Sequence, residues 1–243
     1  MLELILLSVS IVSLLSFSGA LFLAFNKKIL NKILVLLVAF ASGALLGGAF
    51  LHLIPESFGF GEGSLIFVLF GILIFFILEK FLHWRHCHIG KCEIHEFAQL
   101  NLIGDGIHNF LDGMIIAASF LLSVPTGVVT TLAIIAHEIP QEIGDFGVLL
   151  YAGLKSKKAL FYNFLSALTA VAGAILAYFL AIYVKEITMI ILPIAAGGFI
   201  YIASTDLIPE LHKRAKPSES LLQFSLLLVG IALMWVLKIA FVS

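Results

Sequence analysis

A short polar stretch, HEIPQEIGDF, interrupts a long apolar segment of the chain and begins at His137. On a helix, His137, Gln141 and Asp145 would follow one another about one turn apart. Glu138 and Glu142 would form an adjacent row on the same helix. Imidazole and carboxylate groups are ligands that zinc and iron accept in proteins. The stretch therefore indicates either a metal site or the zinc-dependent chemistry of a hydrolase.

A second polar stretch, NLIGDGIHNFLDG, begins at Asn101. Its polar residues recur at offsets of 0, 4, 7 and 11, which places them in one stripe along a helix. The stripe consists of Asn101, Asp105, His108 and Asp112, with Asn109 beside it. Because only a short connection around Pro125 separates the two stretches, their helices are expected to be antiparallel neighbours whose middles meet.

The two stretches place five carboxylates in apolar segments whose cores contain no lysine or arginine. These carboxylates are Asp105, Asp112, Glu138, Glu142 and Asp145. Each charged group at the centre of a bilayer costs about 3 kcal/mol on insertion scales. Protonation, a water-filled cavity or a bound cation would each relieve this cost, and the two histidines favour a divalent transition metal. The alternative is a buried polar network that only fixes helix packing.

A proline lies inside the first of these stretches. Pro140 has no N–H group, so the carbonyl of Ala136 loses its helical partner. Irregular backbone at membrane depth is expected where it lines a cavity or a site. The proline therefore predicts a helix that opens beside a bound ion.

The composition is typical of a polytopic membrane protein. Of the 243 residues, 61% are hydrophobic and 12% are charged, whereas a soluble domain is about a quarter charged. The mean hydropathy is +1.15. The formal net charge of −1 and the lack of a basic patch argue against a nucleic-acid partner. The first residues, MLELILLSVS, have no positive segment and no small-residue cleavage site, which predicts a retained first span.

Apolar segments of roughly 20 residues, the length of a membrane span, recur along the chain. We expect eight spans, at 2–26, 33–54, 64–83, 97–119, 126–150, 160–184, 187–211 and 219–242. Their connections are short. The expected fold is therefore an all-α polytopic membrane protein in which residues 1–243 form a single transmembrane domain embedded in the lipid bilayer.

The positive charges alternate between the two ends of these spans. Twelve of the fourteen Lys and Arg residues lie in or beside the first, third, fifth and seventh connections. The other two are Lys185 and Lys238. Because cytoplasmic loops carry the Lys/Arg excess, these four connections are expected in the cytoplasm and both termini outside.

A five-residue motif closes both the second and the seventh span. It reads HLIPE from His52 and DLIPE from Asp206, and each copy follows a pair of glycines. The two spans run in opposite directions across the membrane, as in an inverted repeat of spans 1–3 and 6–8 around spans 4 and 5. Two unrelated helices that end at prolines are the alternative.

These features together resemble the ZIP (Zrt-, Irt-like protein) family of metal transporters. The resemblance is carried by HNFLDG from His108, by HEIPQEIGDF from His137 and by NFLSA from Asn163, and it is closest to the subgroup with His-Glu-x-Pro-His-Glu. It implies a transmembrane transporter domain that moves divalent metal ions into the cytoplasm through a midplane site between spans 4 and 5. It also implies that the protein is not an enzyme. The ligands that it implies, for one ion or two adjacent ions, are His108, Asn109, Asp112, His137, Glu138 and Glu142.

The chain departs from that subgroup at Gln141, which stands where the subgroup has its second histidine. An amide oxygen is a harder and weaker ligand than imidazole. We keep Gln141 in the expected metal site, with Zn²⁺ as the expected transported substrate and Fe²⁺, Mn²⁺, Cd²⁺ or broad selectivity as the alternatives. No organic cofactor is expected, and the lack of a GxxxxGK[ST] motif argues against direct use of ATP. The plasma or inner cell membrane is the expected location, and a homodimer is left open.

Polar residues at helix ends, together with Asn101, Asp105 and Asp145 near the site, suggest a path for the ion. The expected topology places His52 and Glu56 at the outer end of span 2, where they would help metal enter. The inner end of span 7 would release it, through Asp206, Glu210 and His212. Ordinary interfacial residues are the alternative, above all for the two glutamates.

The third connection, at 84–95, is rich in histidine and contains both cysteines of the chain, so no disulfide framework is implied. Its candidate metal ligands are His86, Cys87, His88, Cys92 and His95. The spacing does not match a standard zinc finger. We expect a cytoplasmic loop that collects or senses metal, with a solvated loop as the alternative.

An intramembrane zinc protease is the remote alternative function. Such enzymes carry His-Glu-x-x-His on a regular helix, with the glutamate as the base. Here Gln141 replaces the second histidine and Pro140 lies inside the motif. Both departures argue against proteolysis.

Overall fold

The structure is a computed structural model that describes residues 1–24, 27–59, 61, 63–86, 94–184, 187–213 and 217–242. The described residues form eight helical rods, and none of them lies in a strand. The unbroken rods are α5 (Ser64–His86), α6 (Ile94–Leu122), α7 (Val124–Tyr151) and α12 (Pro217–Val242). The segmented rods are α1 (Leu2–Leu14) with the 3₁₀ turn η1 (Leu15–Ala20) and α2 (Leu21–Ala24), α3 (Lys27–Gly47) with the π turn η2 (Gly48–Leu53) and α4 (Ile54–Phe58), α8 (Ser156–Ala167) with α9 (Thr169–Tyr183), and α10 (Ile187–Ile202) with the π turn η3 (Ala203–Leu207) and α11 (Ile208–His212).

Within the described residues, five segments are long and apolar enough to cross a membrane by themselves. They are Leu2–Ala20, Lys32–Phe58, Ser156–Tyr183, Ile187–His212 and Glu219–Ala240. The helices α6 and α7, with 29 and 28 residues, are also long enough to cross but carry the polar stripes. The protein is therefore an all-α polytopic membrane protein. The fourth span is longer than its expected range of 97–119, because the helix continues beyond the apolar core at both ends.

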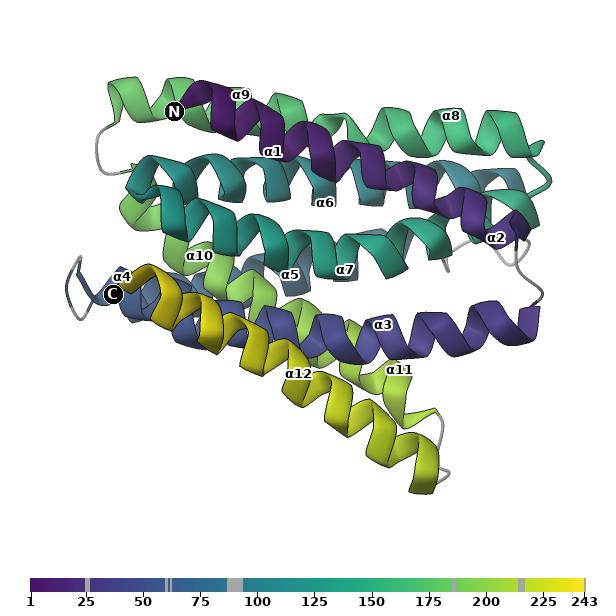
Figure 1. Cartoon of the computed structure of the whole chain (residues 1–243). Coiled ribbons are helices and arrows are strands. Elements are labelled where there is room, and N and C mark those ends of the chain that lie inside the picture. The colour runs from purple at the N-terminus through teal and green to yellow at the C-terminus, as the bar shows by residue number, and fades with distance from the viewer. Residues whose placement is uncertain are drawn as a thin grey trace.

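The rods pack in two groups (Figure 1). In one group, α6 packs on α8 and α9, and α7 packs on η1. In the other, α12 packs on α3, and α10 packs on α5. The groups meet where α3 lies against α7 and where α10 lies against α6. Both chain termini lie at the same end of the bundle, as expected for an even number of crossings (Figure 1).

Several helix crossings are so close that only glycine fits, and two of them involve α12 and α5. At the crossing of α3 and α12, a Cβ atom added to Gly43 would lie 2.0 Å from the carbonyl oxygen of Leu227. At the crossing of α5 and α10, a Cβ atom on Gly197 would lie 2.1 Å from the carbonyl oxygen of Val68. Small residues at membrane-helix contacts allow the backbones to approach and so increase van der Waals contact.

Replacing Gly43 with alanine is therefore expected to destabilise the bundle. The added methyl group must push α3 and α12 apart, and overpacking of this kind costs about 1–3 kcal/mol. Gly144, within α7, is the matched control because its added Cβ would meet nothing within 4 Å. Thermal unfolding of the purified protein in detergent should show a lower midpoint for Gly43→Ala and no loss for Gly144→Ala. Equal midpoints for the two variants would contradict the close crossing.

The two Ile-Pro-Glu motifs share one local structure. In each, a π turn leads into a short helix, and the isoleucine N–H donates to the carbonyl five residues earlier, from Ile54 to Ala49 and from Ile208 to Ala203. The proline after each isoleucine has no N–H, and the wider turn accommodates the interrupted ladder. The segments α3–η2–α4 and α10–η3–α11 run in opposite directions through the bundle (Figure 1).

The expected opening of the helix at Pro140 is wrong. The helix α7 continues without a break from Val124 to Tyr151, and Pro140 is buried inside it. The proline still lacks its N–H group, but the turns before and after it remain α-helical. Irregular backbone occurs instead at the π turns before Pro55 and Pro209.

Candidate metal centre

The candidate metal centre lies between α6 and α7, which follow one another with almost no loop. α6 ends at Leu122, and Ser123 caps the next helix by accepting a hydrogen bond from the Thr126 N–H at 3.1 Å. Pro125 occupies the first turn of α7, where its missing N–H costs nothing. This immediate reversal confirms that the two helices are neighbours, and it brings their polar stripes together.

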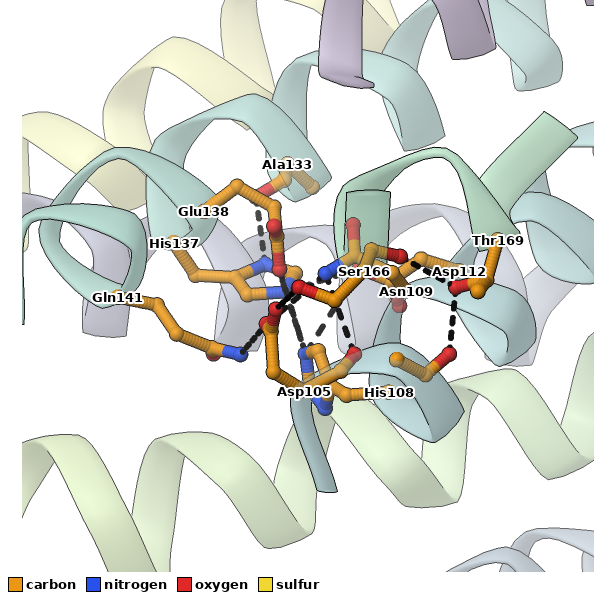
Figure 2. Close-up of polar contacts among 11 residues, drawn as sticks. Asp105, His108, Asn109, Asp112, Ala133, His137, Glu138, Gln141, Ser166 and Thr169 are labelled. Atoms are coloured by element: carbon orange, nitrogen blue, oxygen red, sulfur yellow. Dashed lines mark hydrogen bonds and ion pairs between the residues drawn. The ribbon is translucent and has the colours of Figure 1, made fainter. Parts of the chain in front are cut away.

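Four side chains converge where the two stripes meet (Figure 2). His108 and Asp112 come from α6, His137 and Glu138 come from α7, and one ligand atom of each lies within 4.8 Å of all the others. We call this set the four-ligand cluster. The Nε2 atoms of His108 and His137 are 3.2 Å apart, and Asp112 Oδ2 is 3.2 Å from His137 Nε2 and 3.7 Å from His108 Nε2. Glu138 Oε1 lies 3.4 Å from His108 Nε2 and 3.5 Å from His137 Nε2.

The orientation of His137 is fixed by a backbone hydrogen bond. Its Nδ1 lies 3.2 Å from the carbonyl oxygen of Ala133, and because a carbonyl can only accept, Nδ1–H is the donor. In the neutral ring, Nε2 then carries the lone pair and points into the cluster. Metal-binding histidines are commonly held by an outer hydrogen bond of this kind.

The carboxylates of the cluster are buried with unmet hydrogen-bonding capacity. Asp112 and Glu138 have no exposed surface, and His137 is 1% exposed. Among the described residues, none donates a hydrogen bond to Asp112 Oδ1 or to either oxygen of Glu138. Buried anionic oxygens without donors are costly unless a cation binds them. The side chain of His108, at 16% exposure, is the accessible edge of the cluster.

Aromatic rings from the second helix group border the cluster. Phe75 of α5 meets the His108 ring edge-on at 6.3 Å between centroids, and Phe199 of α10 lies 6.2 Å from the His137 ring. Both phenylalanines are buried. The cluster therefore lies at the interface between the two helix groups, beside an apolar wall that excludes water and strengthens electrostatic attraction.

A second polar group surrounds Asp105, next to the four-ligand cluster (Figure 2). Asp105 Oδ1 accepts hydrogen bonds from Asn109 Nδ2 at 2.9 Å and from Gln141 Nε2 at 3.5 Å. Its Oδ2 accepts a hydrogen bond from the Ser166 hydroxyl. The structure thus turns the amides of Asn109 and Gln141 toward Asp105, and it does not bring them into the four-ligand cluster.

Two further carboxylates on α7 have amide partners. Asn163 Nδ2 donates to Glu142 Oε2, and Asn101 Nδ2 donates to Asp145 Oδ1 at 3.0 Å. The second oxygen of each carboxylate, Glu142 Oε1 and Asp145 Oδ2, is buried and accepts no hydrogen bond within the described part of the chain. Glu142 therefore lies outside the four-ligand cluster but keeps a free acceptor.

The candidate residues at the end of span 2 lie away from the centre. His52, in the π turn η2, donates from Nε2 to the carbonyl oxygen of Met234 on α12 at 2.8 Å. That bond leaves Nδ1 as its remaining ligand atom. Glu56 is exposed in the first turn of α4.

The candidate residues at the end of span 7 are also separate from the cluster. Asp206 accepts a hydrogen bond from the Thr205 hydroxyl at 3.0 Å, and Glu210 pairs with Lys213 at the surface. His212 is exposed at the end of α11. Of the histidines in the third connection, His86 ends α5 and His95 lies in the first turn of α6. Cys87, His88 and Cys92 lie outside the described residues.

Several polar residues around the centre were not among the site residues predicted from the sequence. Span 6 contributes Asn163 and Ser166, which orient Glu142 and Asp105. A carboxylate in span 3, Glu79, accepts a hydrogen bond from the Tyr201 hydroxyl of α10. The sequence does contain a signal for these residues. Two polar residues three apart in span 6, and an acidic residue in the apolar span 3, are both unusual in membrane helices.

A helical membrane protein with a buried imidazole and carboxylate centre between two of its spans has the architecture typical of membrane metal transporters. A sequence model described as the ZIP zinc transporter matches residues 2–96 and 87–238 of this chain. The chain therefore belongs to the ZIP family, and the resemblance to this family found in the sequence is confirmed. Membership in this transporter family places the protein outside the enzymes, including the membrane proteases.

Several curated proteins are similar over most of the chain. Zinc transporter ZIP13 of Pongo abelii is 39% identical over 216 residues, which cover 82% of this chain and 65% of that protein. Zinc transporter ZIP13 of Mus musculus is 35% identical over 250 residues, covering 84% of this chain and 69% of the relative. Zinc transporter zipt-7.2 of Caenorhabditis elegans is 30% identical over 272 residues, which cover 86% of this chain and 59% of that protein. The chain thus spans roughly two thirds of the length of these relatives.

Proposed function

We propose that this protein carries zinc across the membrane into the cytoplasm and that the four-ligand cluster holds the ion midway. One observation carries the proposal. Five of the six distances between the ligand atoms of the cluster fall between 3.2 and 3.7 Å. A tetrahedron with corners about 2.1 Å from its centre, the zinc–ligand distance, has edges of about 3.4 Å. The side chains are therefore spaced for a single tetrahedral ion.

The donor set supports zinc over the hard cations. Two imidazole nitrogens and two carboxylate oxygens suit zinc and iron, whereas magnesium and calcium take oxygen ligands in six or more positions. The names of the relatives point in the same direction, since each is called a zinc transporter. Iron, manganese and cadmium remain the substrates against which zinc should be compared.

A second ion position next to the cluster is supported by unused oxygens. Buried acceptors without a donor, within the described residues, include Asn109 Oδ1, Glu142 Oε1, Asp145 Oδ2 and Asn163 Oδ1. Such an oxygen-rich position would bind zinc more weakly than the four-ligand cluster and would accept harder metals more readily. Gln141 belongs to this position through its hydrogen bond to Asp105.

Replacing Gln141 with histidine is expected to strengthen the second position. The new imidazole would face the Asp105 carboxylate and add a nitrogen ligand where only oxygens are present. Isothermal titration of the purified protein should then show a second zinc ion bound about tenfold more tightly, with zinc favoured over manganese in competition. Unchanged binding of both metals would show that residue 141 does not face an ion.

The topology supports alternating access to this centre. Eight spans are favoured by the eight rods and by the position of both termini at one end of the bundle. An inverted repeat is favoured by the π turns that α3–η2–α4 and α10–η3–α11 share. The close crossing of α3 with α12 has a counterpart in the crossing of α5 with α10, which this repeat would relate. Transporters built from inverted repeats place the substrate site at the repeat interface.

The charge pattern gives the orientation of the protein, and the direction of transport, into the cytoplasm, is the one that the resemblance to the ZIP family implies. The Lys/Arg-rich connections would face the cytoplasm and both termini the outside of the cell membrane. The outer end of span 2, with His52 and Glu56, would then receive zinc, and the inner end of span 7 would release it. Protons should be released when zinc binds, because its ligands bind it deprotonated. A homodimer is not required by this scheme.

The proposal is tested by uptake into proteoliposomes that contain a fluorescent zinc indicator. Wild-type protein should carry zinc faster than empty vesicles, and excess cadmium or iron should compete more strongly than magnesium. Glu138→Gln should be inactive, because it removes one anionic ligand while keeping the side-chain size. Wild-type vesicles that load no faster than empty ones would refute zinc transport.

A further inference from the structure

A pocket of about 440 Å³ lies between α11 and the first turns of α12, far along the chain from the metal centre. Its lining is Ile208, Leu211, His212, Ser220, Gln223, Phe224 and Leu227. Four of the seven lining residues are apolar, and the pocket lies toward the end of the bundle at which α11 and α12 follow one another (Figure 1). The polar members are His212 on α11 and Ser220 and Gln223 on α12.

Gln223 is the unusual residue of this pocket. Its neighbours on α12 face outward, with Leu221 68% and Phe224 57% exposed, whereas Gln223 is only 6% exposed. Its Nε2 is buried and, within the described part of the chain, has no hydrogen-bond acceptor. A buried amide donor without an acceptor is unfavourable, so the pocket is built for a ligand that supplies an oxygen.

The depth of Gln223 in the bilayer indicates the kind of ligand. It is the seventh residue of α12, which begins at Pro217, so it lies about 9 Å along the helix from that end. The polar layer on each side of a bilayer is about 5–7 Å thick outside the hydrocarbon core. A helix of 26 residues is about 39 Å long, which matches a bilayer with both of its polar layers, and in that placement the amide lies near the depth at which phospholipid phosphate and ester groups meet the acyl chains.

We propose that this pocket binds a phospholipid of the leaflet at the α11–α12 end. The Gln223 amide donates to a phosphate or ester oxygen of the lipid, and the exposed His212 side chain, which also lines the pocket, can reach the headgroup. The acyl chain lies along the exposed ring of Phe224 and past Leu227. The lipid joins α11, which carries Glu210, to α12. This site is independent of the zinc site.

The proposal is tested by native mass spectrometry of the intact protein in detergent. After delipidation, wild type is titrated with phosphatidylglycerol, with phosphatidylethanolamine and, separately, with inorganic phosphate. Gln223→Met keeps the length of the side chain and removes the donor. Ser225→Ala is the matched control, because Ser225 lies on the same helix, is exposed, and bonds only within its own helix to the Leu221 carbonyl.

Wild type and Ser225→Ala should each retain one phospholipid about tenfold more tightly than Gln223→Met, which loses one hydrogen bond. Gln223→Glu, which replaces the donor with an anion, should also lose the lipid. Zinc binding by each variant, measured in parallel, reports whether the protein is folded. Equal lipid retention by wild type and both folded Gln223 variants, or binding of inorganic phosphate without any lipid, would overturn the proposal.

Discussion

Zinc uptake is expected to fall at least about a hundredfold when His137 is replaced by leucine, because loss of an outer-shell partner alone costs about 10–100-fold. The substitution removes one imidazole and leaves the carboxylates of Asp112 and Glu138 facing each other with only His108 beside them. Leucine is compatible with the surroundings, since His137 packs against the buried Phe199 ring. The loss is therefore expected in metal binding and not in folding.

The measurement is the initial rate of zinc uptake into proteoliposomes together with zinc affinity in detergent. The matched control is His212→Leu, which removes a histidine that is exposed at the end of α11. That variant should keep most of its uptake and all of its affinity for the central ion. If His137→Leu transported zinc at the wild-type rate, the four-ligand cluster would not be the transport site.

The second large effect is expected at Glu142. Its Oε1 is a buried acceptor without a donor among the described residues, and its Oε2 accepts from the Asn163 amide, so we expect the carboxylate to bind an ion beside the four-ligand cluster. Glu142→Gln removes that charge while keeping the volume. Uptake should fall about 10–100-fold, whereas the first zinc ion should still bind with nearly unchanged affinity.

Glu210→Gln is the control for this experiment. Glu210 is exposed and forms a surface pair with Lys213, and such pairs contribute little. Its loss should change uptake by no more than about threefold, within the 1 kcal/mol of an exposed pair. A Glu142→Gln variant that transports like Glu210→Gln would exclude an ion next to Glu142.

Much of the centre could be predicted from side-chain spacing alone. The offsets from Asn101 to Asp112 and the row beginning at His137 define the helix faces, and the short connection at Pro125 makes those faces meet. The convergence of His108 with His137 follows from helix geometry and needs no tertiary detail. Helical membrane proteins are favourable cases, because each polar residue in a span must find a partner.

The partners within the site could not be predicted in this way. Spacing places Asn109 and Gln141 on the polar faces, but their orientation depends on Asp105 and on Ser166 from span 6, which is distant in sequence. The prediction that Pro140 opens its helix was also wrong, because a proline inside a packed helix need not interrupt it. Packing against other spans decides whether the helix stays regular at a proline or forms a π turn before it.

The most direct test of the proposed zinc site is zinc K-edge X-ray absorption of the purified protein loaded with one equivalent of zinc. We predict a four-coordinate ion with two imidazole nitrogens at about 2.0–2.1 Å and two carboxylate oxygens at about 2.0–2.2 Å. The signal of one imidazole should disappear in His137→Leu. A shell of six oxygens without imidazole in the wild-type protein would contradict the four-ligand cluster as the zinc site.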